Sequence, residues 1–597
     1  MKTPNAPSTV DPQVADEPVG PVILRLEIER FRGIEQFDWR PERGVNVILG
    51  GGDVGKTTIL DAIALLLAPT NSTAVADSDY FARRTESGFS IGAVMVLPSA
   101  TGIDHQYKPS WPWLWNGADA EVPNTDGEGQ AAGDLVYWLR VRGTEDLELA
   151  YEIVQPDGTT DALTVGLRRS IGLVRLGGDD RNDRDLRLVY GSALDRLLSD
   201  KSLRSRVASR FSDSEVTSEL SESATTALSV LDGAFKRQHL PSGLSLSLTG
   251  GPGASIASMI GLTAARNGVQ LPLTSWGAGT RRLAALEIAE QNQGAFPITV
   301  VDEVERGLEP YRQRTLMEQL QNTKSQVFVT THSPFAIAAT PQNSLWYADV
   351  AGKIGPLHGK KVSALRARDP AAFLSRLTIM AEGATEVGFV SVLLERALGG
   401  PLEHHGLHVC DGGGNESTLD LLQVLSAAGM RFGGFADNEG TYPTRWQQLG
   451  DSLGAILFRW EAGCIEENIV RVASDAQLKS LVEDPSGGLT GMRLRSLADR
   501  LGLSTKDFDA IRTSVGAGLR ALIIDAALGK VPIGKESEEK EFKRHAQIWF
   551  KTEVGGRELA EKVFSMDLWS PLKPTLLPFC CAVRTTVGLS TIADISS

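Results

Sequence analysis

The chain has 597 residues, of which 42% are hydrophobic and 22% are charged, and its formal net charge is −14. At about 100–200 residues per domain this length predicts three or four domains, and the apolar content is enough to bury a core. The acidic total argues against a protein that coats nucleic acid. It leaves room for a DNA enzyme with a local basic groove, because acidic metal sites contribute to the sum.

The sequence has no feature of a membrane span or an export signal. Its mean hydropathy is −0.10, and no apolar run reaches the roughly 20 residues that a membrane helix needs. The first twenty residues are polar and rich in proline. The cysteines Cys410, Cys464, Cys580 and Cys581 show neither a disulfide framework nor zinc spacing. We therefore expect a cytoplasmic protein without a membrane partner.

The N-terminal part predicts strands, one helix and an insertion. Residues 22–49 contain the alternating VILRLEIERF and the apolar GVNVILG, and the helical pattern TTILDAIALLLA follows them. Residues 99–133 form a loop-like insertion that contains Trp111, Trp113 and Trp115. Packing on a β-ribbon is the favoured role of these tryptophans, and stacking on bases is the alternative. Residues 134–175 alternate again and predict an antiparallel sheet.

The middle of the chain changes pattern twice. Residues 185–240 are helical and polar, and we interpret them as a helical arm that serves dimerisation. Strand patterns return at SGLSLSLTG, PITVVDE and SQVFVTTH, and the helical pattern TRRLAALEIAEQ separates the first two. This alternation predicts a mostly parallel sheet. A second alternation starts near residue 377 and includes LTIMAEG, LHVCDGGG, RFGGFADNE and AILFRW, whereas the last hundred residues are helical.

Residues 50–57, GGGDVGKT, fit the phosphate-binding pattern GxxxxGK[ST] between a predicted strand and a predicted helix. In this motif backbone N–H groups surround the phosphates, the lysine reaches the β and γ oxygens, and the hydroxyl binds Mg²⁺. The alternative, a glycine turn that caps an ordinary helix, is disfavoured by the strand–loop–helix setting. The expected nucleotide-binding residues here are Gly50, Gly52, Gly55, Lys56, Thr57 and Thr58.

Three downstream segments support an ATPase. Asp302 and Glu303 end the apolar strand ITVV, where one carboxylate can hold Mg²⁺ and its neighbour can activate water. His332 follows another apolar strand, at a position from which it could contact the γ-phosphate. Residues 274–282, TSWGAGTRR, form a glycine-rich turn that opens a helix and predict a second anion site. Each signal is weak alone, but their order is informative.

The segments LEIERFRGIEQFDW, SWGAGTRR, VVDEVERGLEP and THSP, with the glycine loop, resemble ATP-binding-cassette ATPases of the DNA-maintenance type. Within that group the chain is most similar to the OLD (overcoming lysogenization defect) family. The resemblance implies that Ser275, Gly277 and Gly279 complete the ATP site of a second subunit. It also implies that Glu303 is the hydrolytic base and that His332 is the switch histidine.

Two positions depart from the family pattern, and one motif is not located. Val304 replaces the usual proline, and Glu309-Pro310 replaces a common His-Pro, but neither change touches the hydrolytic residues. The motif that is not located is the glutamine loop, for which the stretch around Asp77–Phe81 or beyond is the candidate.

Carboxylates follow several strands of the second alternation. Glu382 ends a strand and Glu386 lies one helical turn later, so both can face one point. Asp437 and Glu439 are two residues apart at the end of a later strand, RFGGFA, and so lie on one side of an extended chain. Glu461, Glu466 and Glu467 follow a third strand. Active sites form at the carboxyl ends of parallel strands, and oxygen ligands suit Mg²⁺ or Mn²⁺ better than zinc. The alternative to a metal site is that Glu382 and Glu386 belong to an ordinary glutamate-rich helix start and that Asp437–Glu439 form a plain turn.

This arrangement resembles a Toprim domain, in which a glutamate and a DxD pair hold the metal for phosphodiester chemistry. Here the pair reads Asp437-Asn438-Glu439, so the second acid is one carbon longer. The resemblance implies two metal ions, with Glu382, Glu386, Asp437, Glu439 and Glu466 as ligands, and a lysine near the C-terminus. Lys551 is the lysine we select, and Lys535 and Lys562 are the alternatives. Gly412–Gly414 either admit a phosphate or form a plain loop.

The predicted fold is α/β, with a P-loop ATP-binding-cassette ATPase head and a helical arm, followed by a Rossmann-like Toprim domain and a helical C-terminal lobe. The expected divisions are a flexible tail (1–20), the two ATPase parts (21–184 and 246–375), the arm (185–245), the Toprim core (376–475) and a helical part that completes it (476–597).

The resemblance implies an ATP-binding endonuclease that uses Mg²⁺ or Mn²⁺ to nick or cut double-stranded DNA, in anti-phage defence or DNA processing. It is expected to form a homodimer or a higher oligomer and to work with a separately encoded helicase or defence partner. Two alternatives stay open: an ATP-dependent DNA-binding or structural protein whose Toprim domain does not cut, and a nuclease that ATP silences.

Overall fold

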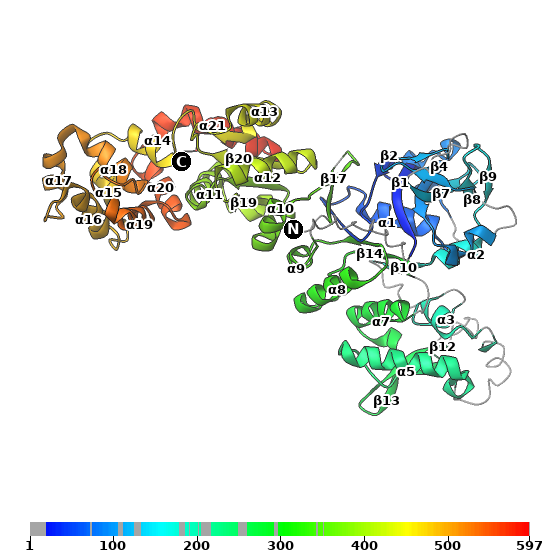
Figure 1. Ribbon diagram of the computed structural model, residues 1–597. Helices are drawn as coiled ribbons and strands as arrows, with labels where there is room; N and C mark the ends of the chain where they lie inside the picture. The colour runs from blue at the N-terminus through cyan, green and yellow to red at the C-terminus, as the bar shows by residue number, and fades with distance from the viewer. Residues whose placement is uncertain are drawn as a thin grey trace, which may run out of the picture. The chain divides into compact units, whose positions relative to one another are not determined.

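The computed structural model describes residues 20–71, 75–105, 111–123, 133–177, 185–189, 192–200, 202–203, 216–248, 260–291, 296–341, 344–349 and 351–595. Apart from Gly20, the expected tail lies outside these residues. The chain divides into two compact units, Met1–Ile354 and Gly355–Ser597. Their elements are drawn in Figure 1. The expected domain limits stay predictions, and the limit at residue 375 falls inside the second unit. Within the described parts of the chain, no helix is long and apolar enough to cross a membrane.

The first unit contains an eight-stranded antiparallel sheet. The expected ribbon is part of it, since β5 pairs with β7 and the rings of Trp113 and Trp138 lie 5.6 Å apart. Ring packing is thus confirmed for Trp113, whereas Trp111 is exposed. The strands are β1 (Val22–Phe31), β2 (Ile34–Trp39), β4 (Phe89–Val96), β5 (Trp113–Trp115), β6 (Ala120–Glu121), β7 (Asp134–Gly143), β8 (Leu149–Val154) and β9 (Thr160–Ala162).

A second sheet carries the predicted phosphate loop, and its order is β10-β14-β15-β3-β16-β17. Its pairs from β10 to β16 are parallel, as the alternation of strands and helices predicted. Helix α1 (Lys56–Leu66) contacts strands of both sheets and buries Ile59, Leu60 and Ile63. The strands are β10 (Leu173–Leu176), β14 (Ile298–Val301), β15 (Val327–Thr330), β3 (Val45–Gly50), β16 (Leu345–Ala348) and β17 (Ile354–Pro356).

The predicted antiparallel sheet over residues 134–175 is wrong in its last part. Thr164 caps helix α2 (Val165–Ile171), which buries Leu167 and Ile171 at helical spacing, and β10 then joins the parallel sheet. Two short apolar segments of different period were therefore read as one alternating pattern. Helix α8 (Pro310–Asn322) follows β14, and helix α9 (Pro334–Ala338) follows β15.

The helical segment 185–240 contains α3 (Ala193–Leu198) and α5 (Glu222–Arg237), and residues 204–215 lie outside the described part. Both helices pack with α7 (Ala278–Glu290), beside the three-stranded sheet (Figure 1). That sheet is antiparallel and consists of β11 (Ser245–Leu248), β12 (Ile260–Arg266) and β13 (Val269–Pro272). The SGLSLSLTG strand was expected in the parallel sheet, and this expectation is wrong. The role of the segment in dimerisation stays a prediction.

The second unit is built on a four-stranded parallel sheet in the order β19-β18-β20-β21, which confirms the second alternation. Ile379 and Phe435 share a core with helix α11 (Ala384–Leu398), whereas a Cβ on Gly434 would meet Leu422 of α12 (Asn415–Ala427). The two helices therefore cover opposite faces of the sheet. The strands are β18 (Leu377–Ala381), β19 (Leu407–Asp411), β20 (Phe432–Ala436) and β21 (Leu457–Arg459).

The C-terminal helices share that core, because the cluster around Phe435 continues into Trp549, Leu559 and Phe579. Helix α20 approaches α11 closely through two glycines. A Cβ on Gly556 would lie 2.0 Å from the carbonyl oxygen of Thr385, and one on Gly388 would lie 2.0 Å from that of Glu553. The helices are α10 (Lys360–Arg368), α13 (Pro443–Leu453), α14 (Ile465–Val472), α15 (Leu478–Val482), α16 (Thr490–Leu501), α17 (Phe508–Val515), α18 (Leu519–Ala527), α19 (Glu539–Trp549), α20 (Glu553–Ser565) and α21 (Trp569–Thr586).

Candidate functional site

The glycine loop joins β3 to α1, as the motif predicted. Gly50 cannot carry a side chain, because its φ is +151° and a Cβ would lie 2.5 Å from the carbonyl oxygen of Ala348. Gly55 precedes α1 with a φ of +88°. The Lys56 ammonium donates to the carbonyl oxygens of Gly51 at 2.6 Å and Gly50 at 3.1 Å, and burial lowers its pKa. A helix N-terminus behind a glycine loop with a lysine inside it can bind a phosphate chain.

Asp302 and Thr57 meet at the start of the helix. The Thr57 hydroxyl donates to Asp302 Oδ1 at 3.3 Å, and the Thr330 hydroxyl donates to the same oxygen at 2.5 Å. A hydroxyl and a carboxylate beside a phosphate loop are the ligands that Mg²⁺ uses with a nucleotide. The structure therefore brings together the two predicted residues that fit a nucleotide-bound magnesium ion.

Glu303 follows Asp302 at the edge of the same cavity. Its backbone N–H donates to the Thr330 hydroxyl at 2.8 Å, its φ is +50°, and its side chain is 49% exposed. The exposed carboxylate is thus accessible to water. His332 also lines the cavity, and its backbone N–H donates to Glu305 Oε1 at 2.7 Å. Sequence reasoning missed Glu305, whose carboxylate accepts hydrogen bonds from the Thr331 hydroxyl and the His332 N–H and so holds the segment of His332 in place.

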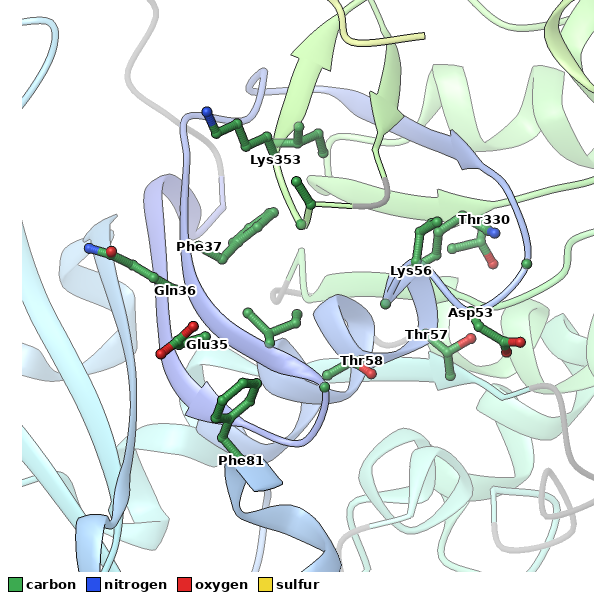
Figure 2. Close-up of a pocket in the computed structure, with 18 of the residues that line it drawn as sticks. Glu35, Gln36, Phe37, Asp53, Lys56, Thr57, Thr58, Phe81, Thr330 and Lys353 are labelled. Carbon is green, nitrogen blue, oxygen red and sulfur yellow. The ribbon is translucent and has the colours of Figure 1, made fainter. Parts of the chain in front are cut away.

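These residues line an open cavity of about 1420 Å³, which is ample for a nucleoside triphosphate. Figure 2 shows the loop residues Lys56, Thr57 and Thr58 on one side of it and Phe37 and Lys353 at other parts of its wall. Gly52 and Gly55 also contribute to the lining. Phe81, from the stretch considered for the glutamine loop, lines the cavity as well.

The predicted signature residues Ser275, Gly277 and Gly279 do not line this cavity in the described part of the chain. The Ser275 hydroxyl donates to the carbonyl of Pro272 at 2.7 Å, and Gly277 immediately precedes α7. Gly279 packs tightly on Gly307, because a Cβ there would lie 2.0 Å from the Gly307 carbonyl oxygen. Their described contacts are therefore with Pro272, α7 and Gly307.

Arg282 connects α7 to the segment that follows β14, and sequence reasoning missed this residue. Its buried guanidinium donates to the carbonyl oxygens of Asp302 at 2.6 Å and Glu303 at 2.8 Å. Burial lowers its pKa. A movement of α7 would therefore act on the backbone of Glu303, the residue that is predicted to activate water.

Glu382 and Asp437 are buried at the carboxyl ends of the adjacent strands β18 and β20. Glu382 Oε2 accepts hydrogen bonds from Asn415 Nδ2 at 3.0 Å and from the Asp437 N–H at 2.9 Å. Asp437 Oδ1 accepts one from the Ile465 N–H at 3.1 Å. Burial, and then the charges of Glu386 and Glu382, raise the pKa of Asp437. These carboxylates are held in place but retain oxygens that can bind a cation.

Glu386 and Glu466 lie in the first turns of α11 and α14 and are 4% and 0% exposed. Glu386 Oε1 and Glu466 Oε2 are buried and have no hydrogen-bond donor among the described residues. Burial, followed by the charge of Glu466, raises the pKa of Glu386. Buried carboxylate oxygens without donors are costly unless a cation neutralises them. This oxygen-rich donor set fits Mg²⁺ or Mn²⁺.

Lys551 is beside this cluster, with its ammonium 3.0 Å from Glu466 Oε1, and the charges of Glu466 and Glu386 raise its pKa. The two alternative lysines have other partners: Lys535 donates to the carbonyl of Asp499 and Lys562 to that of Ser480. Among the lysines considered, Lys551 therefore has the geometry for a role at the acidic cluster.

The other predicted acids are placed less centrally. Glu439 is exposed, although its charge adds to the effect of burial, which raises the pKa of Glu382. Glu461 is exposed, and Glu467 pairs with Lys530 at 3.6 Å. Gly412 and Gly414 donate their N–H groups to the carbonyls of Ala381 and Glu382, so this loop packs on the end of β18.

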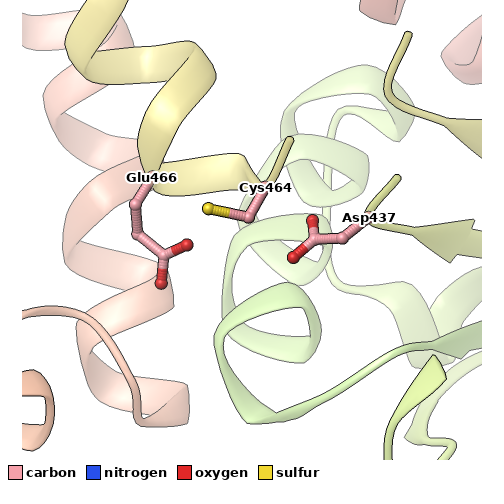
Figure 3. Close-up of side chains that lie close together, drawn as sticks. All are labelled: Asp437, Cys464 and Glu466. Atoms are coloured by element: carbon pink, nitrogen blue, oxygen red, sulfur yellow. The ribbon is translucent and has the colours of Figure 1, made fainter. Parts of the chain in front are cut away.

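Two residues of the cluster were missed by sequence reasoning. Asn415 follows the glycine loop and orients Glu382. Cys464 precedes α14, and its sulfur and carboxylate oxygens of Asp437 and Glu466 all lie within 4.8 Å of one another. Figure 3 shows these three side chains converging. A free cysteine that lacks zinc-ligand spacing gave no signal in the sequence.

Family models match both units. An AAA domain model matches residues 25–97, and the model described as "AAA domain, putative AbiEii toxin, Type IV TA system" matches residues 158–338. The TOPRIM domain model of overcoming-lysogenization-defect-like proteins matches residues 373–438. The chain therefore combines an ATPase-type domain that carries a phosphate loop with a Toprim domain. This combination confirms the resemblance to ATPase–Toprim proteins of the OLD family.

No curated protein matches the chain. Among solved structures, the Smc head bound to the C-winged helix domain of ScpA is 14% identical with a TM-score of 0.38, and the match covers 57% of this chain and 99% of that one. The SMC head domain from Thermotoga maritima is also 14% identical, with a TM-score of 0.28 and coverages of 57% and 100%. The ATP complex of the recombination mediator protein RecF is 13% identical, with a TM-score of 0.33 and coverages of 57% and 99%.

Proposed function

We propose that this protein is an ATP-regulated, metal-dependent endonuclease that nicks or cuts double-stranded DNA at its Toprim domain. The observation that carries the proposal is the buried acidic cluster with Lys551 at its margin. Two carboxylate oxygens there have no hydrogen-bond donor among the described residues, and an ammonium group lies 3.0 Å from a third. Such a cluster is expected to bind cations and, through them, a phosphodiester.

Glu382, Glu386, Asp437 and Glu466 would hold Mg²⁺ or Mn²⁺, with Glu439 as a further ligand. Two bound ions would supply positive charge to the attacking and leaving oxygens of an in-line displacement. Asn415 and the Asp437 N–H keep Glu382 oriented, so that its second oxygen is free to bind. The Lys551 ammonium would contact a phosphate oxygen of the DNA and offset its negative charge.

The nucleotide site would act as the regulator. Lys56 and the N–H groups of the glycine loop would hold the phosphates, while Thr57 and Asp302 would hold Mg²⁺. Glu303 would take a proton from the hydrolytic water, and His332 would contact the γ-phosphate.

The predicted signature residues Ser275, Gly277 and Gly279 do not line the nucleotide cavity, which supports a composite site in which they contact the nucleotide of a second copy. The active form would then be a homodimer or a higher oligomer. A role in anti-phage defence or DNA processing, with a separately encoded helicase or defence partner, is supported by the OLD resemblance alone.

The test is nicking of supercoiled plasmid with Mg²⁺ or Mn²⁺, with and without ATP, by the wild type, Glu382→Gln and Lys56→Ala. We expect the wild type to nick and Glu382→Gln to be inactive, and the Lys56→Ala result then shows whether nucleotide drives or restrains cutting. Measurable ATP hydrolysis without cutting of any DNA substrate would instead indicate the DNA-binding or structural alternative.

A further inference from the structure

A thiol lies inside the acidic cluster of the Toprim domain. Cys464 is the residue before α14, and Glu466 follows it in the first turn of that helix. Asp437 directly follows strand β20, and its Oδ1 accepts a hydrogen bond from the N–H of Ile465, which lies between Cys464 and Glu466 in the chain. The backbone thus fixes the sulfur and two carboxylates around one point.

The three side chains have the spacing of a metal site. Their ligand atoms all lie within 4.8 Å of one another. Bonds of about 2.3 Å to sulfur and about 2.0–2.2 Å to oxygen place the ligands of a tetrahedral zinc ion about 3.5 Å apart. Side-chain rotations would bring these atoms to that separation, and Figure 3 shows the Cys464 thiol directed toward Glu466 and the Asp437 carboxylate beside it.

An independent observation also indicates a cation at this point. Glu466 is 0% exposed, and its Oε2 has no hydrogen-bond donor among the described residues. Lys551 lies 3.0 Å from the other oxygen, Oε1, and does not satisfy Oε2. Asp437 is also buried, at 5% exposure, and brings a second carboxylate to the same place. Lys551 supplies one positive charge for two buried carboxylates, and a divalent ion would supply the charge that is still needed and bind Oε2.

We propose that Asp437, Cys464 and Glu466 form a Zn²⁺ site within the Toprim centre, and that Zn²⁺ bound there inhibits the nuclease. Thiolate sulfur favours Zn²⁺ strongly over Mg²⁺, which prefers six oxygen ligands and keeps several waters. When the ion binds, the Cys464 thiol releases its proton to solvent and the sulfur lone pair forms the bond to zinc.

A zinc ion held by these residues would occupy Asp437 and Glu466, two of the carboxylates that the catalytic ions need. The inhibition rests on the function proposed above, whereas the binding of zinc does not. Zinc availability would thereby set the fraction of the protein that can cut.

Cd²⁺ binds as a spectroscopic substitute for Zn²⁺, because a Cd²⁺–thiolate bond absorbs in the ultraviolet. Full-length wild type, Cys464→Ser and the matched control Cys581→Ser would be titrated with Cd²⁺, and with Zn²⁺ by calorimetry. Cys581 is a free cysteine that donates to the carbonyl of Ile592, apart from the cluster. We expect the absorption band in the wild type and in Cys581→Ser and its loss in Cys464→Ser. The Zn²⁺ dissociation constant should rise at least about tenfold in Cys464→Ser.

An equal band and equal Zn²⁺ affinity in Cys464→Ser would overturn the site, and the thiol would then only pack beside Glu466. Plasmid nicking in Mg²⁺ with added Zn²⁺ tests the inhibition separately: the wild type should be inhibited at a Zn²⁺ concentration at least about tenfold lower than Cys464→Ser. Cadmium binding through Cys464 without any nicking would refute the nuclease and leave the zinc site standing.

Discussion

The Lys551 ammonium lies 3.0 Å from Glu466 Oε1, and the turn that carries this lysine is held from two sides. The Thr385 hydroxyl, at the start of α11, donates to the carbonyl of Phe550 at 2.9 Å. The buried Arg493 donates to the carbonyls of Ile548 and Trp549 at 3.0 and 3.1 Å. The helical C-terminal lobe therefore places a cation beside the acidic cluster at the ends of the sheet strands, and the lobe and the sheet form one structural unit.

Replacing Lys551 by methionine should reduce plasmid nicking by about 10²-fold, because the ammonium that would neutralise a phosphate oxygen is lost while most of the side-chain volume remains. Lys535→Met is the matched control, since that lysine donates to the carbonyl of Asp499 instead. Initial rates with Mg²⁺ would be compared for both variants. Equal rates for Lys551→Met and the wild type would exclude a role for this lysine in cutting.

The acidic cluster should make the stability of the metal-free protein depend on pH. Burial raises the pKa of Asp437 and Glu386, so between the ordinary carboxyl pKa of about 4 and these raised values the folded protein holds protons that the unfolded chain has released. This contribution to stability is fully present below about pH 4 and is lost as the pH rises through the raised pKa values. The metal-free protein should therefore have a lower Tm at pH 8 than at pH 6.

Mg²⁺ should raise the Tm more at pH 8 than at pH 6, because the ion competes with protons for the same oxygens. Differential scanning fluorimetry with EDTA or Mg²⁺ at the two pH values measures both effects. In Asp437→Asn with Glu386→Gln the difference between the two pH values should shrink. If the double variant keeps the full pH dependence, other groups cause it.

The sequence predicted the parts of the sites that depend on strand ends and local motifs. Glu382 and Asp437 were assigned from apolar runs followed by acids, and parallel strands bring such ends together. Lys56 and Thr57 were predicted from the phosphate-loop motif, and Asp302 from its place at the end of the apolar strand ITVV. These inferences need only the order of the elements and the side of the sheet on which each strand ends.

Contacts made by tertiary packing were not predictable in this way. In the sequence Arg282 has no feature that separates it from other arginines in helices. Its role follows only from the packing of α7, which lets it donate to the carbonyl oxygen of Asp302 after β14. Cys464 becomes a ligand candidate only when β20 and α14 converge. The helix α2 was missed because its seven residues are too few to display a clear period. Lys551 was selected with two rivals, and only the packing of α20 on α11 distinguishes it from them.

Glu303→Gln should bind ATP with unchanged affinity and hydrolyse it about 10²–10⁴-fold more slowly, since the amide cannot accept a proton from water but keeps the size of the side chain. Glu309→Gln is the matched control, because that glutamate is exposed at the start of α8 and does not line the cavity. Phosphate release and binding of a fluorescent ATP analogue would be measured. Hydrolysis by Glu303→Gln at the rate of the wild type would mean that another group activates the water.

Gly556→Ala should destabilise the second unit and reduce nicking together, because the contact between α11 and α20 is made by backbone. A Cβ on Gly556 would lie 2.0 Å from the carbonyl oxygen of Thr385. The backbone fixes the positions of both atoms, so no side-chain rotation can relieve the clash. The helices would have to separate, at a cost of about 1–3 kcal/mol, which lowers the Tm of a domain of this size by roughly 2–12 °C.

Gly450→Ala provides the matched control in α13, where a Cβ meets no atom within 4 Å and the substitution should be neutral or slightly stabilising. Thermal unfolding and plasmid nicking would be measured for both variants. Separation of the helices would displace the Thr385–Phe550 hydrogen bond and with it Lys551. Each folded molecule of Gly556→Ala should therefore cut DNA more slowly than a wild-type molecule. A loss of stability with full specific activity would show that the lysine does not depend on this helix contact.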